Sequence, residues 1–547
     1  MRLNKYFLLT AAVISAASIV YELLIASAMS FLLGDTILYF SLVIGLFLVS
    51  MGIGSYFSQK LGKSPSEEDS EETNTKIFLN VELFLAVIGG FSVLILLFTG
   101  ALAVNFASQT AELQMAAEQG QIIKIIFSTT IPLHLIGLIL ILSIGGLIGV
   151  ELPILFRLLK TSDHFRSGLS NMLAFDYLGS FFGSLLFPLV FLPTLGILKT
   201  SFLMGALNVS VCALIVWVGA LRKPLKAAYG LAVAVLLFLF IISFAQSDNY
   251  ENYLDTLFYS FDSPTEIISK IQSPYQTIVL TEREENGHPE LALFLNGYLQ
   301  FDSAGESRVY HETLIHPAMH LAADRSKVLI LGGGDGLPAK EVLRYLEVER
   351  VVNVDIDKEI IEFSKNNSRM RDYNGDAFQD ERLEVIINDA FIYVREAREK
   401  FDAIFVDFPE GIDVPLARSY SKQFILDLKR LLNDGGILVF QVDTYDTLSY
   451  WVVVKTIQGA GLAVLPMYTG ELSENSYEAE GIILASNKPF VFSRLDGIDD
   501  FWVKPIFTNK DLDFSSKIAD LRVNTFYQPT FLNYFRREFW YGFWIGS

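Results

Sequence analysis

Cysteine, histidine and positive charge are scarce in this chain of 547 residues. The single cysteine, Cys212, lies in an apolar run, so disulfide bonds within the chain and metal sites built from several cysteines are excluded. The six histidines show no metal-ligand spacing, and we expect no metal site. Lys and Arg number 42 against 61 Asp and Glu, which gives a net charge of −19 without any basic patch. We therefore expect no nucleic-acid partner.

Polar residues are also scarce in the N-terminal half. The chain is 52% hydrophobic with a mean hydropathy of +0.40, which is too apolar for an ordinary soluble protein. Most of the long apolar segments reach the roughly 20 residues that span a bilayer. They lie at about 7–33, 35–58, 77–105, 124–156, 172–195, 199–221 and 226–245. The sequence thus predicts a multi-span α-helical membrane domain at residues 1–246, with about seven spans in the cell membrane.

The pattern becomes that of a soluble protein after residue 247. Short alternating strands occupy residues 265–302, and the turn signal Asn296-Gly297 separates the last two of them. This predicts a small β N-terminal subdomain, built on a β-hairpin and joined by a linker helix, at residues 247–325.

Strands then alternate with helices, which predicts a Rossmann-like α/β nucleoside-binding domain at residues 326–490. Residues 491–547 form an aromatic-rich C-terminal extension, which we interpret as packing rather than as a bilayer-interface belt. The buried parallel strands of the α/β domain are expected at 328–331, 351–354, 384–387, 403–406 and 437–441.

A glycine-rich turn follows the first of these strands. The run Gly332-Gly333-Gly334-Asp335-Gly336 lets the backbone bend tightly and approach a ligand closely. The second strand ends in Asp355, and an acid at this position of a βαβ unit is placed to bind ribose hydroxyls. These features describe a nucleoside pocket. Asp335, an acid inside the glycine turn, suits a cationic ligand and would repel a phosphate.

A series of motifs marks residues 265 to 486 in one order and spacing. They are Ser273-Pro274-Tyr275-Gln276, Leu295-Asn296-Gly297-Tyr298-Leu299-Gln300, Tyr310-His311-Glu312 with His316-Pro317, Gly332 to Gly336 with Glu341-Val342-Leu343, Val354-Asp355-Ile356-Asp357, Asp389-Ala390, and Phe401-Asp402 to Asp407. Together they resemble the polyamine aminopropyltransferases, the spermidine synthase family, in their membrane-fused form.

The resemblance implies an enzyme that moves an aminopropyl group from decarboxylated S-adenosylmethionine, its co-substrate, to an amine such as putrescine. Spermidine and methylthioadenosine would be the products, and no prosthetic group is expected. By the same resemblance, Asp407 is the proton acceptor. The residues expected to hold the amine are Tyr310, His311, Asp335 and Glu410. Those expected to hold the nucleoside are Gln276, Gln300, Gly332, Gly334, Asp355, Asp389, Ala390 and Pro415.

The sequence departs from the family pattern around these positions. A Glu306-Ser307 pair replaces the family's Asp-Glu, and the shorter Asp355 replaces a glutamate. Ala390 replaces a glycine, and the loop after Asp407 reads Phe-Pro-Glu-Gly. The first acid of that loop is retained, so the reaction class stands. The identity of the amine is left open.

The residue types independently fit this chemistry. An alkylamine has a pKa of about 10 and must lose a proton before it attacks a sulfonium carbon, and a buried carboxylate can accept that proton. Two alternatives stay open: an S-adenosylmethionine-dependent methyltransferase, and a polyamine transporter or sensor with an enzyme-like binding domain. Asp335 and Asp407 argue against the first, because ordinary S-adenosylmethionine carries a carboxylate of its own. Retention of Asp407 argues against the second.

The membrane half carries acids in or at the ends of its apolar segments: Glu22, Glu82, Glu151 and Asp176. Such acids are costly and usually face an interior or a cavity. Either they hydrogen-bond between helices near an interface, or they form a site for a cationic amine. The glycine-containing run 179–184 indicates close helix packing.

Basic residues beside the apolar segments mark one side of the membrane, and with seven spans they would place the C-terminal half outside the cell. Its nucleoside co-substrate is made in the cytoplasm, so we expect a cytoplasmic catalytic domain and one miscounted segment or one misleading loop charge. The expected partners are a polyamine and the lipid bilayer. A homo-oligomer is compatible with the sequence, which does not set the oligomeric state.

Overall fold

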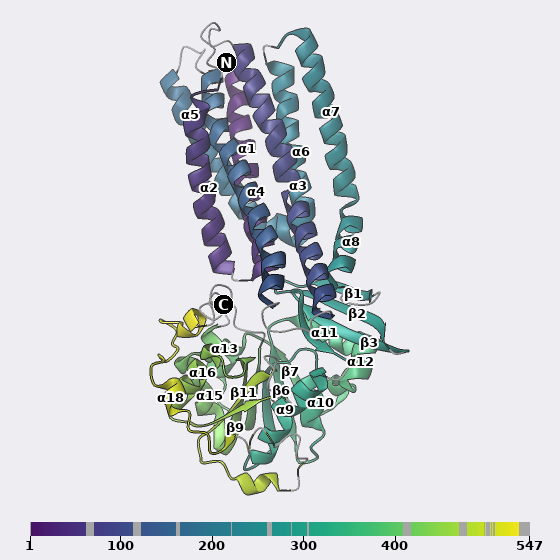
Figure 1. Ribbon diagram of the computed structural model, residues 1–547, viewed down its shortest axis with the longest axis vertical. Coiled ribbons are helices and arrows are strands. Elements are labelled where there is room, and N and C mark those ends of the chain that lie inside the picture. Colours follow the sequence, from purple (N-terminus) through teal and green to yellow (C-terminus); the bar gives the residue numbers. More distant parts are fainter. Residues whose placement is uncertain are drawn as a thin grey trace. The chain divides into compact units, whose positions relative to one another are not determined.

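The computed structural model divides the chain into two compact units, Met1–Ser263 and Pro264–Ser547. Long helices build the first unit, and two β-sheets with surrounding helices build the second (Figure 1). The structure describes residues 2–34, 36–61, 71–112, 122–159, 165–219, 221–259, 265–285, 287–303, 306–408, 417–469, 479–496, 498, 504, 506 and 509–534.

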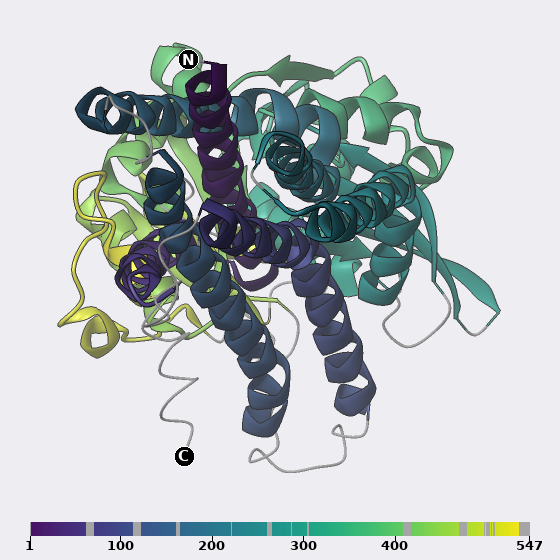
Figure 2. The same cartoon turned by 90° about the horizontal axis from the view of Figure 1, so that it is seen from above.

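Most helices of the first unit are long because their sequences contain apolar stretches of many turns. Helix α1 packs against α2, α3, α4, α5 and α6, and α3 packs against both α4 and α6. Figure 2 shows the end of α3 and the start of α4 projecting together from the other helices. The elements are α1 (Arg2–Leu33), α2 (Thr36–Ser58), α3 (Glu71–Glu112), α4 (Ile122–Leu159), α5 (Phe165–Leu186), the π-helical η2 (Phe187–Phe191), α6 (Leu192–Val218), α7 (Lys223–Ala245) and α8 (Ser247–Tyr259).

Small residues let several of these helices approach backbone to backbone. A Cβ at Gly54 of α2 would lie 2.0 Å from the carbonyl oxygen of Gly146 in α4. A Cβ at Gly179 of α5 would lie 2.0 Å from the carbonyl oxygen of Ala12 in α1, and Gly183 repeats this contact one turn later. Only glycine permits such approaches. The close packing predicted for the run 179–184 is therefore confirmed.

Within the described residues, six helical stretches are long and apolar enough to cross a membrane. One of them, Ser170–Val218, is 49 residues long and contains the expected segment 172–195 and most of the expected segment 199–221. It joins α5, η2 and α6, and Gly196 inside it has a φ of 72° that interrupts the helix. A stretch of this length exceeds the roughly 20 residues that one crossing needs. The number of crossings therefore stays a prediction.

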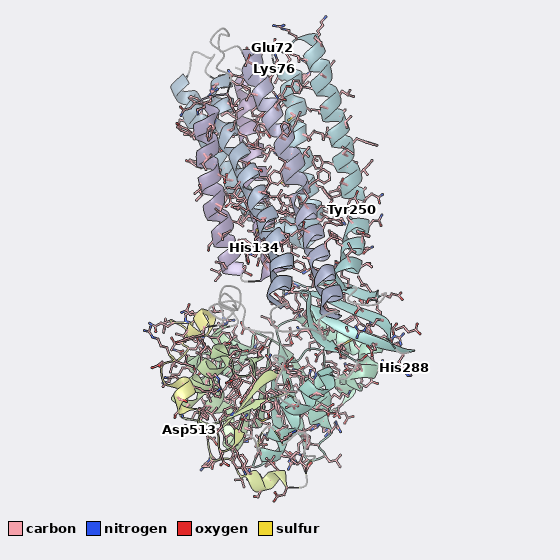
Figure 3. All side chains as sticks on the ribbon, viewed as in Figure 1. Glu72, Lys76, His134, Tyr250, His288 and Asp513 are labelled. Atoms are coloured by element: carbon pink, nitrogen blue, oxygen red, sulfur yellow. The ribbon has the colours of Figure 1, made fainter. Side chains whose placement is uncertain are left out.

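Polar side chains also make contacts in this unit, among them the labelled Glu72, Lys76 and His134 (Figure 3). Glu72 and Lys76, one turn apart at the start of α3, form an ion pair of 3.1 Å, and Arg222 contacts the other oxygen of Glu72 at 3.1 Å. Tyr39 of α2 and His134 of α4 share a hydrogen bond of 2.9 Å. The contacts of Arg222 with Glu72 and of Tyr39 with His134 join segments that lie far apart in the sequence.

The second unit begins with a four-stranded antiparallel sheet in the order β1-β2-β3-β4. The turn between β3 and β4 has positive φ at Asn296 (52°) and Gly297 (84°), as a two-residue hairpin requires, so the predicted hairpin is confirmed. Side chains from this sheet share a buried core with helices α10 (Leu337–Leu343) and α11 (Lys358–Asn366). The strands are β1 (Thr265–Gln272), β2 (Thr277–Glu285), β3 (His288–Leu295) and β4 (Tyr298–Asp302).

A seven-stranded sheet follows, in the order β10-β11-β9-β8-β5-β6-β7. The strands from β9 to β7 are parallel and correspond to the five expected from the sequence, which confirms the Rossmann-like fold. The antiparallel pair β10 and β11 was not expected. The strands are β5 (Lys327–Gly332), β6 (Arg350–Asp355), β7 (Leu383–Ile387), β8 (Phe401–Asp407), β9 (Leu432–Thr444), β10 (Ala463–Tyr468) and β11 (Glu480–Ser486).

Helices cover both faces of this sheet, and its central strands are buried on both sides. In β5, Leu329 and Leu331 belong to the core on one face, while Val328 and Ile330 belong to the core on the other. This alternation follows from the two-residue period of a strand. The remaining helices are α9 (Glu306–Leu321), α12 (Ser368–Asn374), η3 (Ala377–Gln379), α13 (Ala390–Glu396), η4 (Arg418–Tyr420), α15 (Lys422–Leu431), α16 (Leu448–Gly459), η5 (Phe492–Leu495) and α18 (Ser515–Ile518).

The described part of the C-terminal extension packs on the α/β domain. Ile518, Leu521, Phe531 and Leu532 are buried in the core that also contains residues of α15 and α16. The aromatic residues at 539–544 lie outside the described residues.

Candidate active site

The carboxyl ends of three adjacent strands bring the candidate residues together. Strand order reverses between β8 and β5, because β6 and β7 continue the sheet on one side of β5 and β8 lies on the other. Ligands bind at such a switch point in open α/β sheets. Gly332 at the end of β5 pairs with Asp407 at the end of β8, and Asp355 ends β6 on the other side. A nucleoside site is therefore expected here on topology alone.

Glycine is required in the turn after β5 for two separate reasons. Gly332 has a φ of 87°, and a Cβ there would lie 2.0 Å from the carbonyl oxygen of Asp407. A Cβ at Gly334 would lie 2.7 Å from a carboxylate oxygen of Asp355. The turn thus lies directly against both acids, so a side chain at either position would displace one of them.

Asp335 in this turn makes a hydrogen bond to the backbone and interacts electrostatically with His311. Its Oδ1 accepts a 2.9 Å hydrogen bond from the backbone nitrogen of Leu337, the first residue of α10. Burial raises the pKa of the Asp335 carboxyl, and the positive charge of His311 and the bond from Leu337 oppose that rise. Asp335 therefore both stabilises the turn and faces His311.

Asp407 lies at the centre of the candidate site. The Tyr310 hydroxyl, from α9, donates a 2.5 Å hydrogen bond to its Oδ1. The pKa of Asp407 is raised to about 6: burial contributes most, Asp335 adds to the rise, and His311 and Tyr310 oppose it. Burial and the nearby acids also hold the pKa of Tyr310 well above its ordinary value, so this hydroxyl stays protonated and donates. The result is a buried carboxylate whose pKa is shifted toward neutral pH.

Asp355 is held in a similar way at the end of β6. Its Oδ1 accepts a 2.8 Å hydrogen bond from the backbone nitrogen of Asp357. Burial raises the pKa of Asp355 to about 6, and the charges of Asp357 and Asp335 contribute to the rise. The charge of Asp335 thus hinders the ionisation of both Asp355 and Asp407. A cationic ligand would relieve this repulsion.

Gln276 reaches the loop after β6 through Asp357. The side-chain nitrogen of Gln276 donates to Oδ2 of Asp357 at 2.8 Å, and the hydroxyl of Ser273 donates to the same oxygen at 2.7 Å. Asp357 also accepts from the backbone nitrogen of Glu359 and so caps α11. The small sheet is therefore tied to the residue two positions after Asp355.

Asp389 and Ala390 lie at the start of α13, after β7. Oδ1 of Asp389 caps the helix by accepting from the backbone nitrogen of Phe391 at 2.7 Å, and its Oδ2 forms a 3.3 Å ion pair with Arg418. The Arg418 guanidinium lies 3.9 Å from the centre of the Phe391 ring. Asp389 thus has a capping role in addition to the nucleoside role expected from the sequence.

Among the described residues, the expected Gln300 is not joined to this group by a hydrogen bond. The side-chain nitrogen of Gln300 reaches only the carbonyl oxygens of Tyr298 and Leu299, both at 3.5 Å, among the hydrogen bonds of the described residues. Glu410 and Pro415 lie outside the described residues.

Sequence reasoning gave no role to Asp357 or Glu480. Asp357 is buried and lies in the motif after β6, where a second acid two residues beyond the strand is the available signal. Glu480 begins β11, and its charge contributes to the raised pKa of Tyr310. No local pattern singles out Glu480, because β11 reaches the site only through the antiparallel order of the sheet.

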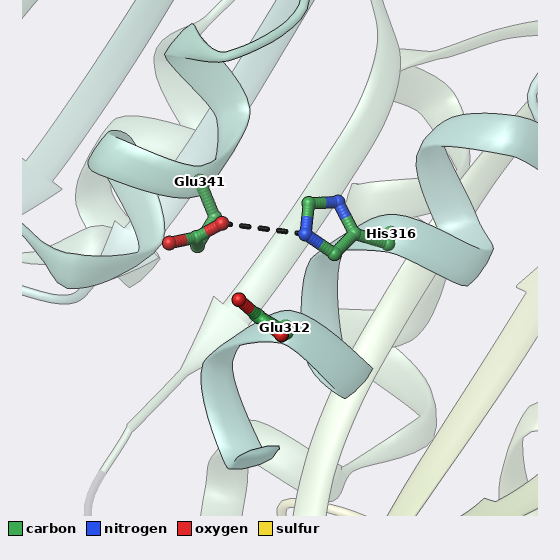
Figure 4. Close-up of side chains that lie close together, drawn as sticks. All are labelled: Glu312, His316 and Glu341. Carbon is green, nitrogen blue, oxygen red and sulfur yellow. Dashed lines mark ion pairs between the residues drawn. The ribbon is translucent and has the colours of Figure 1, made fainter. Parts of the chain in front are cut away.

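A second cluster of titratable groups links α9 to α10 (Figure 4). Glu312, His316 and Glu341 offer ligand atoms within 4.8 Å of one another, which is close enough for a metal ion. Arg344 already supplies a positive charge there, at 2.6 Å from Glu341 and 3.4 Å from Glu312, and His316 lies 3.3 Å from Glu341. We interpret the cluster as an ion-pair network that fixes α9, the helix that carries Tyr310 and His311.

Comparisons with known proteins show which proteins this chain resembles. The family model of the spermine/spermidine synthase domain matches residues 307–466. A solved spermidine synthase structure from Thermotoga maritima is 21% identical and covers 47% of this chain and 88% of its own, with a TM-score of 0.39.

Curated relatives match over most of the chain. The polyamine aminopropyltransferase of Leptospira interrogans is 36% identical over 484 residues, which cover 88% of each chain. That of Oceanobacillus iheyensis is 30% identical and covers 98% of each chain. The match therefore includes the first unit, Met1–Ser263, which we call the helical unit. Polyamine aminopropyltransferase 2 of Aquifex aeolicus is 32% identical and covers 95% of this chain and 96% of its own. This chain therefore belongs to the polyamine aminopropyltransferases and is an enzyme of that family.

Proposed function

We propose that this enzyme is bound to the membrane and moves an aminopropyl group from decarboxylated S-adenosylmethionine to an amine such as putrescine. The observation that carries the proposal is the convergence of Asp335, Asp355 and Asp407 at one end of the parallel sheet. Asp335 raises the pKa of both other acids, so this group of carboxylates favours ligands with positive charge, and both the sulfonium donor and the protonated amine carry it.

The donor would be held by its nucleoside part. Asp355 ends the second strand of the βαβ unit, where a carboxylate accepts hydrogen bonds from ribose hydroxyls. Gly334 lies against that carboxylate and leaves no side chain to block the approach of the ligand. Asp335 favours the decarboxylated donor, because the carboxylate of ordinary S-adenosylmethionine would add a further negative charge beside it.

In the transfer step, the amine nitrogen attacks the propyl carbon that is bonded to sulfur. A carbon–nitrogen bond forms while the carbon–sulfur bond breaks, and the electron pair stays on sulfur, which becomes the neutral thioether of methylthioadenosine. The proton lost by the amine passes to Asp407, whose pKa of about 6 leaves it ionised above neutral pH. Tyr310 holds this carboxylate in one orientation through the bond to Oδ1.

The helical unit would lie in the lipid bilayer. Large apolar side chains such as Leu48, Phe84, Leu189 and Leu231 are exposed on its helices, which suits contact with lipid and not with water. The second unit, Pro264–Ser547, which we call the catalytic unit, would then face the cytoplasm, where its donor is made. A tag at the C-terminus that is digested by protease only after the membrane is permeabilised would support this side, and digestion in intact cells would contradict it.

The decisive experiment uses the purified full-length protein in detergent, decarboxylated donor and a panel of amines, with products identified by mass spectrometry. We expect an amine heavier by one aminopropyl unit and an equal amount of methylthioadenosine. Transfer of a methyl group from ordinary S-adenosylmethionine would instead favour a methyltransferase. Binding of amine and donor without release of methylthioadenosine would favour a polyamine transporter or sensor. Asp335→Asn should narrow the preference for the decarboxylated donor.

A further inference from the structure

Four polar side chains meet inside the helical unit where apolar packing is otherwise continuous. Tyr21 of α1, Glu82 of α3 and Asn208 of α6 have no solvent-exposed surface, and Glu151 of α4 has 5%. The four helices pack on one another, α3 against α4 and α6, and α1 against all three. Acids at this depth in an apolar bundle are rare and usually mark a functional site.

Several atoms of these residues lack a hydrogen-bond partner among the described residues. They are both carboxylate oxygens of Glu82, Oε1 of Glu151, the hydroxyl of Tyr21 and both polar atoms of the Asn208 amide. A folded protein core rarely leaves even one such atom unsatisfied. Other polar groups of the same core are satisfied: Ser201 donates to the carbonyl oxygen of Gly90 at 2.8 Å.

The side chains that carry these atoms lie near one another. The carboxyl groups of Glu82 and Glu151 interact electrostatically, and the Tyr21 hydroxyl interacts with both of them. Cys212, one turn after Asn208 on α6, also interacts with both carboxyl groups, which places that face of α6 toward them. Gly89 fixes the tyrosine, since a Cβ at Gly89 would lie 2.7–2.9 Å from the Tyr21 ring.

We propose that this cluster is a binding site for a protonated alkylamine of the kind that the catalytic unit uses or makes. A primary ammonium has three hydrogen-bond donors and no acceptor. The cluster offers the matching acceptors: carboxylate, phenol and amide oxygens, with two acids to balance the positive charge. The surrounding apolar side chains suit the methylene chain of a polyamine. The choice of an amine rests on the proposed function of the catalytic unit.

The test measures binding of labelled spermidine and putrescine to the full-length protein in lipid nanodiscs by equilibrium dialysis. Glu82→Gln and Glu151→Gln should each abolish one saturable class of sites and leave the rate of aminopropyl transfer at saturating amine unchanged. Glu22→Gln is the matched control, because it removes an acid from the same bundle at a half-buried position next to Tyr21 in the sequence. Within the described residues, Glu22 has no electrostatic interaction with Glu82 or Glu151. Glu22→Gln should retain every class of amine-binding sites.

Tyr21→Phe is a second variant that should keep the fold, because it removes only the hydroxyl and leaves the ring against Gly89. It should raise the Kd of the same class of sites roughly tenfold, the usual effect of losing one hydrogen bond to a charged group. Amine binding by Glu82→Gln, Glu151→Gln and Tyr21→Phe equal to that of Glu22→Gln would overturn the proposal. Displacement of the amine by sodium chloride, but not by choline chloride at equal ionic strength, would reassign the cluster to a metal cation.

These outcomes separate this proposal from the function proposed for the catalytic unit. Absence of aminopropyl transfer in the unmodified protein would defeat the proposed function, while the difference in binding between Glu82→Gln and Glu22→Gln would still report on the cluster. Conversely, normal transfer together with equal binding in all variants would leave the enzyme intact and remove the amine site from the helical unit.

Discussion

The hydroxyl of Tyr310 donates a 2.5 Å hydrogen bond to Oδ1 of Asp407, and the two residues come from α9 and the end of β8. The bond requires a protonated tyrosine, and burial with the nearby acids keeps the pKa of Tyr310 far above neutrality. One carboxylate oxygen of Asp407 is thus held by an uncharged donor while the carboxylate keeps its charge. This is the arrangement expected of a proton acceptor that must be oriented without being neutralised.

Asp407→Asn should lower kcat by about 10²-fold or more, the usual scale for a lost general base. The amide has nearly the same shape and can still accept the bond from Tyr310, so the affinity for methylthioadenosine should change little. Tyr310→Phe should lower kcat less, because the carboxylate loses its orientation but remains. Steady-state kinetics with calorimetry of methylthioadenosine binding measures both. Turnover of Asp407→Asn near that of the parent enzyme would remove Asp407 from the chemistry.

The same substitution should stabilise the protein at neutral pH. The pKa of Asp407 is raised from 3.8 to about 6 in the folded state, so folding disfavours the charged carboxylate above that range. The resulting loss of folding stability is complete above pH 6. It disappears as the pH falls toward 4, where the carboxyl is protonated in both the folded and the unfolded protein. Asp407→Asn should therefore have a free energy of unfolding about 1–3 kcal/mol higher than the parent at pH 7.5 and unfold at a higher temperature, with a smaller gap at pH 5. Thermal unfolding in detergent measures the gap, and a gap that widens on acidification would contradict this account.

Asp355→Ala should weaken methylthioadenosine binding by about 1.5–3 kcal/mol, because the ribose hydroxyls lose a charged acceptor. Calorimetry on the full-length protein measures the change. The binding of the amine in the absence of donor should be affected much less, since Asp355 ends a different strand from Asp407. An unchanged methylthioadenosine affinity would place the ribose elsewhere.

Gly334→Ala tests the same contact from the other side. The new methyl group would meet Oδ2 of Asp355 at 2.7 Å and Cγ2 of Ile360 at 2.6 Å, so it should displace the carboxylate and weaken methylthioadenosine binding about tenfold or more. Gly459→Ala is the control, because its methyl group would meet only an ordinary contact at 3.4 Å. Equal nucleoside affinity in the two variants would show that the turn tolerates a side chain.

The parallel strands and the hairpin were predictable because their signals are local. Apolar runs bounded by glycine or acid mark the strands, and Asn296-Gly297 marks the hairpin. Strands β10 and β11 were missed, since an antiparallel return to β9 has no local signature. Within the site, the role of Asp357 depends on Ser273, which lies 84 positions earlier, so only the folded chain reveals it.

The acids of the helical unit show the same limit. All four were expected to face an interior, but Glu82 and Glu151 are buried whereas Glu22 and Asp176 are half-buried. Asp176 accepts a hydrogen bond from Ser15 of α1. Sequence spacing cannot tell these cases apart, because the difference depends on which neighbouring helix faces each acid.

The network around Glu341 should stabilise the protein without a metal ion. His316 and Arg344 lower the pKa of Glu341 from 4.5 to about 2 against the effect of burial. A lowered pKa contributes stability that is present above pH 4.5 and is lost as the pH falls through 2, so Glu341→Gln should destabilise the protein at neutral pH by about 1–3 kcal/mol. Because Arg344 already supplies the balancing charge, chelation with EDTA should change neither the thermal stability nor the transfer rate. A loss of activity in EDTA that a divalent metal restores to the parent enzyme, but not to Glu341→Gln, would instead make Glu312, His316 and Glu341 a metal site.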